Sequence, residues 1–200
     1  MTTFDRLMVR AEDEPLSRVL PVCRRIAVEI GDEDLARWTR LESVGYTADN
    51  PVMTQNTVVP EYRTVGGHWY DDCGRQLLLT DASMGFINET RLRHGVPELE
   101  GIATMPGTLT IPDPKGAEII REHLDVVVTT FRFQPCAVTQ VLSNIRLQLH
   151  DALMSRRQQI AAIPIIRDVP ETEILQLKPG VSGVSIDLKA LWRRVVGGRK

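Results

Sequence analysis

Several features that mark specialised classes of protein are scarce in this sequence. Among its 200 residues are three cysteines, ten aromatic side chains and four lysines. The cysteines lie about fifty residues apart and form no C-x-x-C pair, which excludes a disulfide scaffold and the usual zinc modules. No apolar run is long enough to span a membrane, and the first residues show no basic stretch followed by an apolar one. We therefore expect a cytoplasmic protein.

A strong excess of either charge is also missing. The 24 basic and 26 acidic side chains give a formal net charge of −2, whereas dedicated nucleic-acid-binding proteins usually carry a basic excess. The balance differs along the chain, because residues 1–100 hold 11 basic and 17 acidic side chains (net −6), and residues 101–200 hold 13 and 9 (net +4). The composition is otherwise ordinary for a folded globular chain.

What the first fifty residues do contain is a helical pattern. Apolar side chains recur with helical spacing over residues 16–30 and again over residues 35–41. With Ser17 as N-cap, Pro21 would lie in the first turn, where its missing N–H has no cost. Gly31 is expected to end the first helix, Asp32 to cap the second and Gly45 to stop it. The prediction is an N-terminal hairpin of two antiparallel helices.

The middle of the chain has weaker signals. Residues 62–70 contain two short β-prone runs around Gly66-Gly67, which predicts a small β-hairpin. Helices are expected near residues 83–93, from Pro97 to Ile102, and from the Asp113-Pro114 start to about Val127.

The longest helix is expected from Pro135 to about Ile160, where apolar residues form a continuous stripe. The predicted fold class is mainly α (α+β), with the helical domain spanning residues 1–163. Residues 164–200, here called the tail, form a separate segment.

The tail contains a predicted amphipathic helix over residues 188–196. From Asp187 onward there are five basic residues and one acidic residue, so the helix is basic. Its apolar face can dock onto another protein or subunit, or pack back onto the domain; a membrane or nucleic acid is less favoured. The predicted partner-binding residues of the tail are Leu188, Leu191, Trp192, Arg193, Arg194 and Val195.

Short motifs occur in a characteristic order between residues 15 and 153. Pro15-Leu16-Ser17 runs into Cys23-Arg24-Arg25-Ile26-Ala27, and Gly31-Asp32-Glu33-Asp34-Leu35 follows. Later come Gly95-Val96-Pro97-Glu98-Leu99-Glu100 and Val141-Leu142-Ser143-Asn144-Ile145-Arg146. The motif positions singled out as candidates are Trp38, Gly45, Tyr46, Pro60, Tyr62, Arg63, Glu98, Glu100, Asn144 and Arg146.

In order and spacing these motifs resemble the AbiTii family, small domains of bacterial abortive-infection and phage-conflict loci. The resemblance implies an antiphage role, either as an effector that harms the infected cell or as a partner that restrains one. It implies no catalytic residues.

Two residue sets allow a functional and a structural interpretation. Tyr46, Tyr62 and Arg63 could bind an anion, or Arg63 could pair with a carboxylate such as Glu42 as a structural bracket. Cys23 lies on an apolar helical face and should be inert, whereas Cys136, in the first turn of the long helix, is either a reactive thiolate or, as we expect, a buried structural residue.

A metal-dependent nuclease or hydrolase is an alternative function. Glu61, His68, Asp71 and Asp72 are residue types that hold divalent ions. Adjacent strand residues point to opposite faces, so Asp71 and Asp72 can chelate together only if a turn lies there. The simpler interpretation is a turn that closes the predicted hairpin.

The sequence therefore predicts a component of an antiphage defence system that acts as a protein-interaction, effector or regulatory module. The expected partner is another protein of the same system or a second copy, and neither a cofactor nor a metal is expected. RNA binding through the basic C-terminal half is a further alternative.

Overall fold

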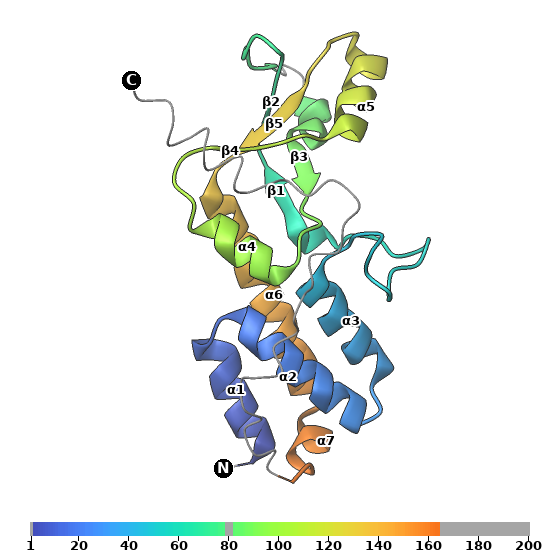
Figure 1. Ribbon diagram of the computed structural model, residues 1–200, viewed down its shortest axis with the longest axis vertical. Coiled ribbons are helices and arrows are strands. Elements are labelled where there is room, and N and C mark those ends of the chain that lie inside the picture. Colours follow the sequence, from blue (N-terminus) through green and yellow to red (C-terminus); the bar gives the residue numbers. More distant parts are fainter. Residues whose placement is uncertain (1, 79–81, 165–200) are drawn as a thin grey trace. The chain divides into compact units, whose positions relative to one another are not determined.

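A computed structural model of the chain describes residues 2–78 and 82–164 (Figure 1). The predicted tail helix at residues 188–196 lies outside the described residues. The described part is mainly helical with small antiparallel sheets, which confirms the predicted fold class.

The chain opens with a helix, α1 (Thr3–Asp13), that the sequence reasoning did not predict. Thr2 and Asp5 form a capping box at its start, with Thr2 Oγ1 accepting from the Asp5 N–H and Asp5 Oδ2 accepting from the Thr2 N–H. Phe4, Leu7 and Ala11 are buried, which is the spacing of one helical face. Both signals were present in the sequence.

The predicted helical hairpin is confirmed as α2 (Leu16–Glu29) and α3 (Glu33–Val44). Gly31 and Gly45 adopt positive φ angles of 72° and 99°, and Asp32 caps α3 by accepting a 2.8 Å hydrogen bond from the Leu35 N–H. These are the turn residues that the local chemistry demands.

The predicted start of α2 was wrong. The helix begins at Leu16 rather than after Ser17, so Pro21 lies beyond the first turn, on the exposed side. The N–H of Ser17 instead donates to Glu100 Oε1 at 3.2 Å. A free backbone N–H in the first turn of α2 is therefore hydrogen-bonded by a carboxylate 83 residues away in the sequence. A local sequence pattern could not predict this contact.

The predicted β-hairpin was also wrong. Strand β1 (Thr64–Gly66) pairs with β3 (Glu89–Arg91), whereas β2 (His68–Tyr70) pairs with β5 (Thr130–Phe133), which in turn pairs with β4 (Leu109–Ile111). All three pairings are antiparallel. Gly67 lies where the chain passes from one sheet to the other, and a Cβ there would lie 2.3 Å from the Arg132 carbonyl oxygen.

The helices of the middle segment differ partly from expectation. Residues 83–93 form a 3₁₀ helix, η2 (Ala82–Asn88), followed by β3 rather than one α-helix. The predicted helix at Pro97 is α4 (Val96–Ala103). The predicted Asp113 cap and Pro114 start are confirmed for α5 (Pro114–Leu124), which ends before Val127 because Asp125 turns into the left-handed region at φ 52°.

The predicted long helix is divided into α6 (Pro135–Ser155) and α7 (Arg157–Ala161) by a break at Arg156. Its buried stripe follows the predicted spacing through Val138, Val141, Ile145, Leu149 and Leu153. Helix α6 contacts α1, α4, β1 and the 3₁₀ helix η1 (Glu61–Arg63). It therefore forms a common support for α1, α4, η1 and β1 (Figure 1).

Candidate functional site

Five motif-region side chains meet where α3, its C-terminal turn and η1 converge. We call Trp38, Glu42, Tyr46, Tyr62 and Arg63 the buried polar cluster. Its centre is an ion pair between Arg63 Nη2 and Glu42 Oε2 at 2.7 Å, with both side chains 0 % exposed. Of the two interpretations of Arg63, the structure shows the pairing with Glu42.

The guanidinium of Arg63 has several further partners. Its Nε donates to Glu42 Oε2 at 3.1 Å, and its Nη1 donates to the carbonyl oxygens of Leu92 (2.9 Å) and His94 (2.8 Å). The group also lies 4.9 Å from the centre of the Tyr46 ring. A buried charge is tolerated only with such partners, so these donors are committed within the fold.

The other carboxylate oxygen of Glu42 accepts hydrogen bonds from two tyrosines. Tyr46 and Tyr62 donate to Oε1 at 2.7 and 2.8 Å, and Trp38 Nε1 donates to the Tyr62 hydroxyl at 2.9 Å. Burial and the negative charge of Glu42 both raise the pKa of each tyrosine. The phenols therefore stay neutral donors, and the cluster fastens η1 to α3.

Most of the other motif positions also make internal contacts. Gly45 is packed so closely that a Cβ would lie 2.6 Å from the Arg93 carbonyl oxygen. Asn144 Nδ2 donates to the Tyr62 carbonyl oxygen at 3.3 Å, and Arg146 donates to the last carbonyl groups around α1, including Glu14 O at 2.9 Å.

The three remaining motif positions have different roles. Glu100, in the middle of α4, receives the Ser17 N–H at the start of α2. Pro60 precedes η1, and Glu98 lies exposed in the first turn of α4. Apart from Pro60 and Glu98, the motif residues connect elements of the fold.

The residues proposed for a divalent ion are not gathered into one site. A turn does follow β2, so Asp71, Asp72 and Cys73 place possible ligand atoms within 4.8 Å of one another. Among the described residues this group includes neither Glu61 nor His68.

Asp71 already has partners within its turn. It accepts from the Arg75 N–H and from Arg75 Nε, both at 2.7 Å. These contacts, the backbone hydrogen bond first, lower the pKa of Asp71. The interpretation of this segment as an Asp- and Gly-containing turn therefore accounts for its geometry, although the turn closes no β1–β2 hairpin.

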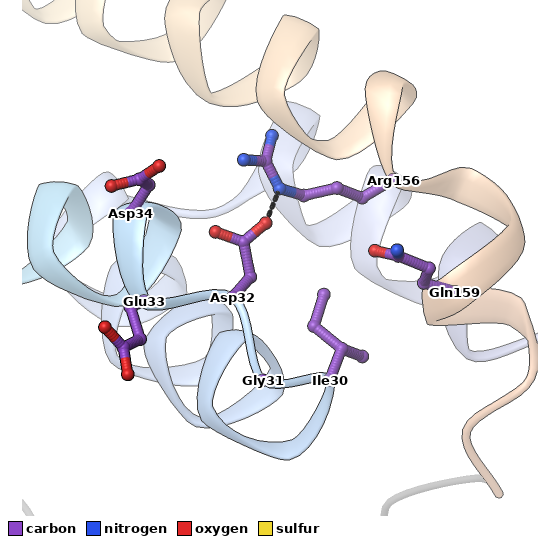
Figure 2. A pocket seen from close by; sticks show the side chains of 7 residues that line it. All are labelled: Ile30, Gly31, Asp32, Glu33, Asp34, Arg156 and Gln159. Carbon is purple, nitrogen blue, oxygen red and sulfur yellow. Dashed lines mark hydrogen bonds and ion pairs between the residues drawn. The ribbon is translucent and has the colours of Figure 1, made fainter.

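The sequence reasoning missed an open pocket of about 470 Å³ at the turn between α2 and α3. Figure 2 shows the ion pair between Asp32 and Arg156 within this pocket, with the Glu33 side chain directed away from that pair. The Arg156 contact and the Leu35 N–H lower the pKa of Asp32. The residues that line the pocket are Ile30, Gly31, Asp32, Glu33, Asp34, Arg156 and Gln159.

This pocket is lined by three carboxylates, one guanidinium and one amide. Its lining holds neither a histidine nor a cysteine nor a serine. Asp32 serves as the α3 cap and as the partner of Arg156 at the α6–α7 break. The Asp32–Arg156 ion pair therefore joins the start of α3 to the end of α6.

The three cysteines occupy different environments. Cys23 is 0 % exposed, which confirms its place on a buried apolar face. Burial raises its pKa to about 12, and the thiol is therefore still expected to be inert. Cys73 and Cys136 are exposed. The expectation that Cys136 is buried was wrong, because the first turn of α6 leaves this side chain at the surface.

Comparisons with known proteins agree with the motif order. The AbiTii family model matches residues 6–173 of the chain, which is most of its length. Searches among curated proteins and among solved structures find no match. Within residues 2–78 and 82–164, no helix has the length and apolarity needed to cross a membrane. The chain therefore belongs to the AbiTii family, a membership that connects it with abortive-infection defence.

Proposed function

We propose that this protein acts in the cytoplasm as an association module of an abortive-infection system. It binds another protein of that system or a second copy of itself, as an effector or a regulator. The observation that carries the proposal is the use of the motif residues inside the fold, with the Arg63–Glu42 pair at 0 % exposure. Because these residues stabilise the fold, we place the binding function on other surfaces of the chain.

The tail is the surface that we propose for association. Its predicted helix combines an apolar face around Leu188 and Trp192 with five basic residues from Asp187 onward. Residues 1–100, in contrast, have a net charge of −6. An acidic surface, on a second copy or on a partner, is the complement that such a helix selects.

Light scattering and co-purification with the products of neighbouring genes test this proposal. Replacing Leu188 and Trp192 by serine removes apolar contacts without changing the charge, so we expect the associated species to disappear. Lys189→Ser, on the polar face of the same helix, is the matched control and should retain association. If the Leu188→Ser/Trp192→Ser variant keeps the same molar mass and co-purifies with the same proteins, the tail proposal is contradicted.

A metal-dependent hydrolase is the second candidate, supported by the convergence of Asp71, Asp72 and Cys73 at one turn. It requires that a divalent ion stabilise the fold. A rise in melting temperature with Mg²⁺ or Mn²⁺ that Asp72→Ala abolishes would favour this candidate over the association module.

A further inference from the structure

The three-stranded sheet β2–β5–β4 has two chemically different faces. On one face, Trp69 and Phe131 are paired across β2 and β5, and their rings meet edge to face with centroids 5.3 Å apart. Helix α5 approaches this face at Gly116, where an added Cβ would lie 2.6 Å from Trp69 Cζ2. Because side chains alternate along a strand, the neighbouring residues lie on the opposite face.

We call that opposite face the outer sheet face and define it by five residues. The register sets His68, Arg132 and Thr110 in one row and Tyr70 and Thr130 in the next. His68 and Thr110 are exposed, and the other three are half-buried. The face therefore combines two rings, one guanidinium and three hydroxyl groups, one of them on the Tyr70 ring.

Among residues 2–78 and 82–164, Arg132 has no hydrogen-bond acceptor on this face. Its guanidinium lies 4.1 Å from the centre of the Tyr70 ring, and its Nε is buried without a hydrogen-bond partner. Among the described residues it forms no ion pair either, in contrast to the fully buried Arg63. A guanidinium stacked on a ring keeps its other flat side and its donors for a ligand.

Thr130 is a second unpaired polar group on the same face. Its Oγ1 is also buried without a hydrogen-bond partner, and it lies two residues from Arg132 along β5. Buried polar groups normally find partners. Both unpaired atoms lie beneath the face rather than at its surface, so contact with a ligand falls to the outer nitrogens of the half-buried Arg132 guanidinium.

The side chains specify the chemistry of that ligand. It must offer acceptor oxygens to a guanidinium and a flat surface to the Tyr70–Arg132 stack and to His68. Single-stranded nucleic acid supplies both, because unpaired bases stack on aromatic rings and on guanidinium planes while phosphate and base oxygens accept hydrogen bonds. An acidic peptide supplies the oxygens alone.

We propose that the outer sheet face binds single-stranded nucleic acid, with a base stacked on the Tyr70–Arg132 pair and an acceptor oxygen at Arg132. The proposal goes beyond the association function, and it uses none of the tail residues on which that function depends. It also differs from RNA binding through the basic C-terminal half, which requires many cations.

The local charge predicts how such binding responds to salt. Near the sheet, Asp71 is paired with Arg75, and Asp72 is exposed. Among the five residues of the outer sheet face, Arg132 is the one side chain that is always positively charged. A single phosphate contact gives a slope of about −0.7 for log K against log salt, whereas five contacts along the tail would give about −3.5.

The test is fluorescence anisotropy of the full chain with a labelled single-stranded RNA octamer at several salt concentrations. We expect a shallow slope and weaker binding of the matching duplex, whose bases are already stacked. Tyr70→Ala should weaken binding about tenfold, the effect of losing one stacked base, whereas Tyr70→Phe retains the ring and should retain binding. Arg132→Gln should weaken binding comparably.

Two further variants separate binding from folding. Thr130→Val removes an unpaired hydroxyl that is too buried to meet a ligand, so it should retain RNA binding while leaving the melting temperature unchanged or raised. Arg121→Gln, on α5 at the opposite face of the sheet, removes the same charge as Arg132→Gln and should have no effect.

Three results of these binding experiments would contradict the proposal. A steep slope with binding that persists in Tyr70→Ala would place the RNA on the tail. Absence of binding, or equal losses in Arg121→Gln and Arg132→Gln, would overturn the proposal. None of these results would bear on co-purification through Leu188 and Trp192.

Discussion

Two arginines show how residue environment decides the use of one side chain. Arg63 is 0 % exposed and is hydrogen-bonded to Glu42 and two carbonyl groups. Arg132 lies on a ring with an unpaired, buried Nε. The first arrangement stabilises a connection within the fold, and the second leaves donors for a ligand.

Removing Arg63 should be severely destabilising. In Arg63→Met, Glu42 would remain buried without its countercharge, which costs about 3–5 kcal/mol of unfolding free energy. Urea denaturation measures this loss. The control is Arg75→Met, because the Arg75 side chain is 80 % exposed in its pair with Asp71 and should contribute at most about 1 kcal/mol. Similar losses in both variants would contradict the assigned role of the buried pair.

Thiol labelling should separate the three cysteines. Cys23 is buried with a pKa raised to about 12, so it should react with a thiol reagent only after denaturation. The Asp72 carboxylate raises the pKa of the exposed Cys73, so Asp72→Asn should accelerate the labelling of Cys73 at pH 8. The exposed Cys136 serves as the internal reference, and rapid labelling of native Cys23 would refute the burial.

At the scale of elements, adjacent glycines have different tasks. A Cβ at Gly67 would lie 2.3 Å from the Arg132 carbonyl oxygen and 2.7 Å from the Phe131 ring, whereas a Cβ at Gly66 would meet nothing within 4 Å. Gly67→Ala should therefore lower the unfolding free energy by about 2–3 kcal/mol through overpacking. Gly66→Ala should be neutral or stabilising by about 0.5 kcal/mol. Thermal melts of both variants decide this, and equal stability would contradict the crossing between sheets at Gly67.

The ion pair between α3 and the α6–α7 break should be sensitive to acid. The pKa of Asp32 is lowered below its usual 3.8 by Arg156 and by the Leu35 N–H. Its ionic contribution is therefore complete above about pH 4 and is lost as the pH falls through the lowered value. Asp32→Asn keeps a capping acceptor but removes the charge, so it should be less stable by about 1 kcal/mol at neutral pH.

A pH series of urea denaturation curves measures that difference. The gap between Asp32→Asn and the unmodified chain should narrow as the pH falls from about 4 toward about 2. Asp34→Asn, in the same pocket but without an ion pair to Arg156, should show no such gap. A gap that widens in acid would mean that another group accounts for the difference.

These elements also show what the sequence could predict. Gly31, Asp32, Gly45 and the Asp113-Pro114 pair act through their own backbone or the next few residues, so the ends they set were predictable. The β1–β3 and β2–β5 pairings join segments about 25 and 60 residues apart. Strands of three or four residues contain too little alternation to specify such partners.

Of the candidate sites, one could be predicted from the sequence and another could not. Pairing of Arg63 with Glu42 was one of two open interpretations, because a motif arginine near a helix-end carboxylate suggests it. The outer sheet face could not be foreseen, since it exists only after β2, β5 and β4 are paired. The alternation Thr130-Phe131-Arg132-Phe133 was the one local signal of the central strand.

At the scale of the whole molecule, α6 and several motif residues hold elements of the fold together. Helix α6 contacts α1, α4, η1 and β1, and Arg146 and Asn144 fasten two of these connections. The acidic first half and the basic end of the chain have opposite charge. We infer that charge steers the tail toward an acidic partner, while its apolar face supplies the stabilising contact.

The most direct test of this account is the plating efficiency of lytic phage on bacteria that carry the defence locus with altered versions of this chain. Association through the tail predicts that Leu188→Ser/Trp192→Ser abolishes protection. It also predicts that Asp71→Asn/Asp72→Asn retains protection, because association through the tail requires no catalytic centre at this turn. Loss of protection in the aspartate variant, with full protection in the tail variant and equal amounts of folded protein in both, would contradict the account.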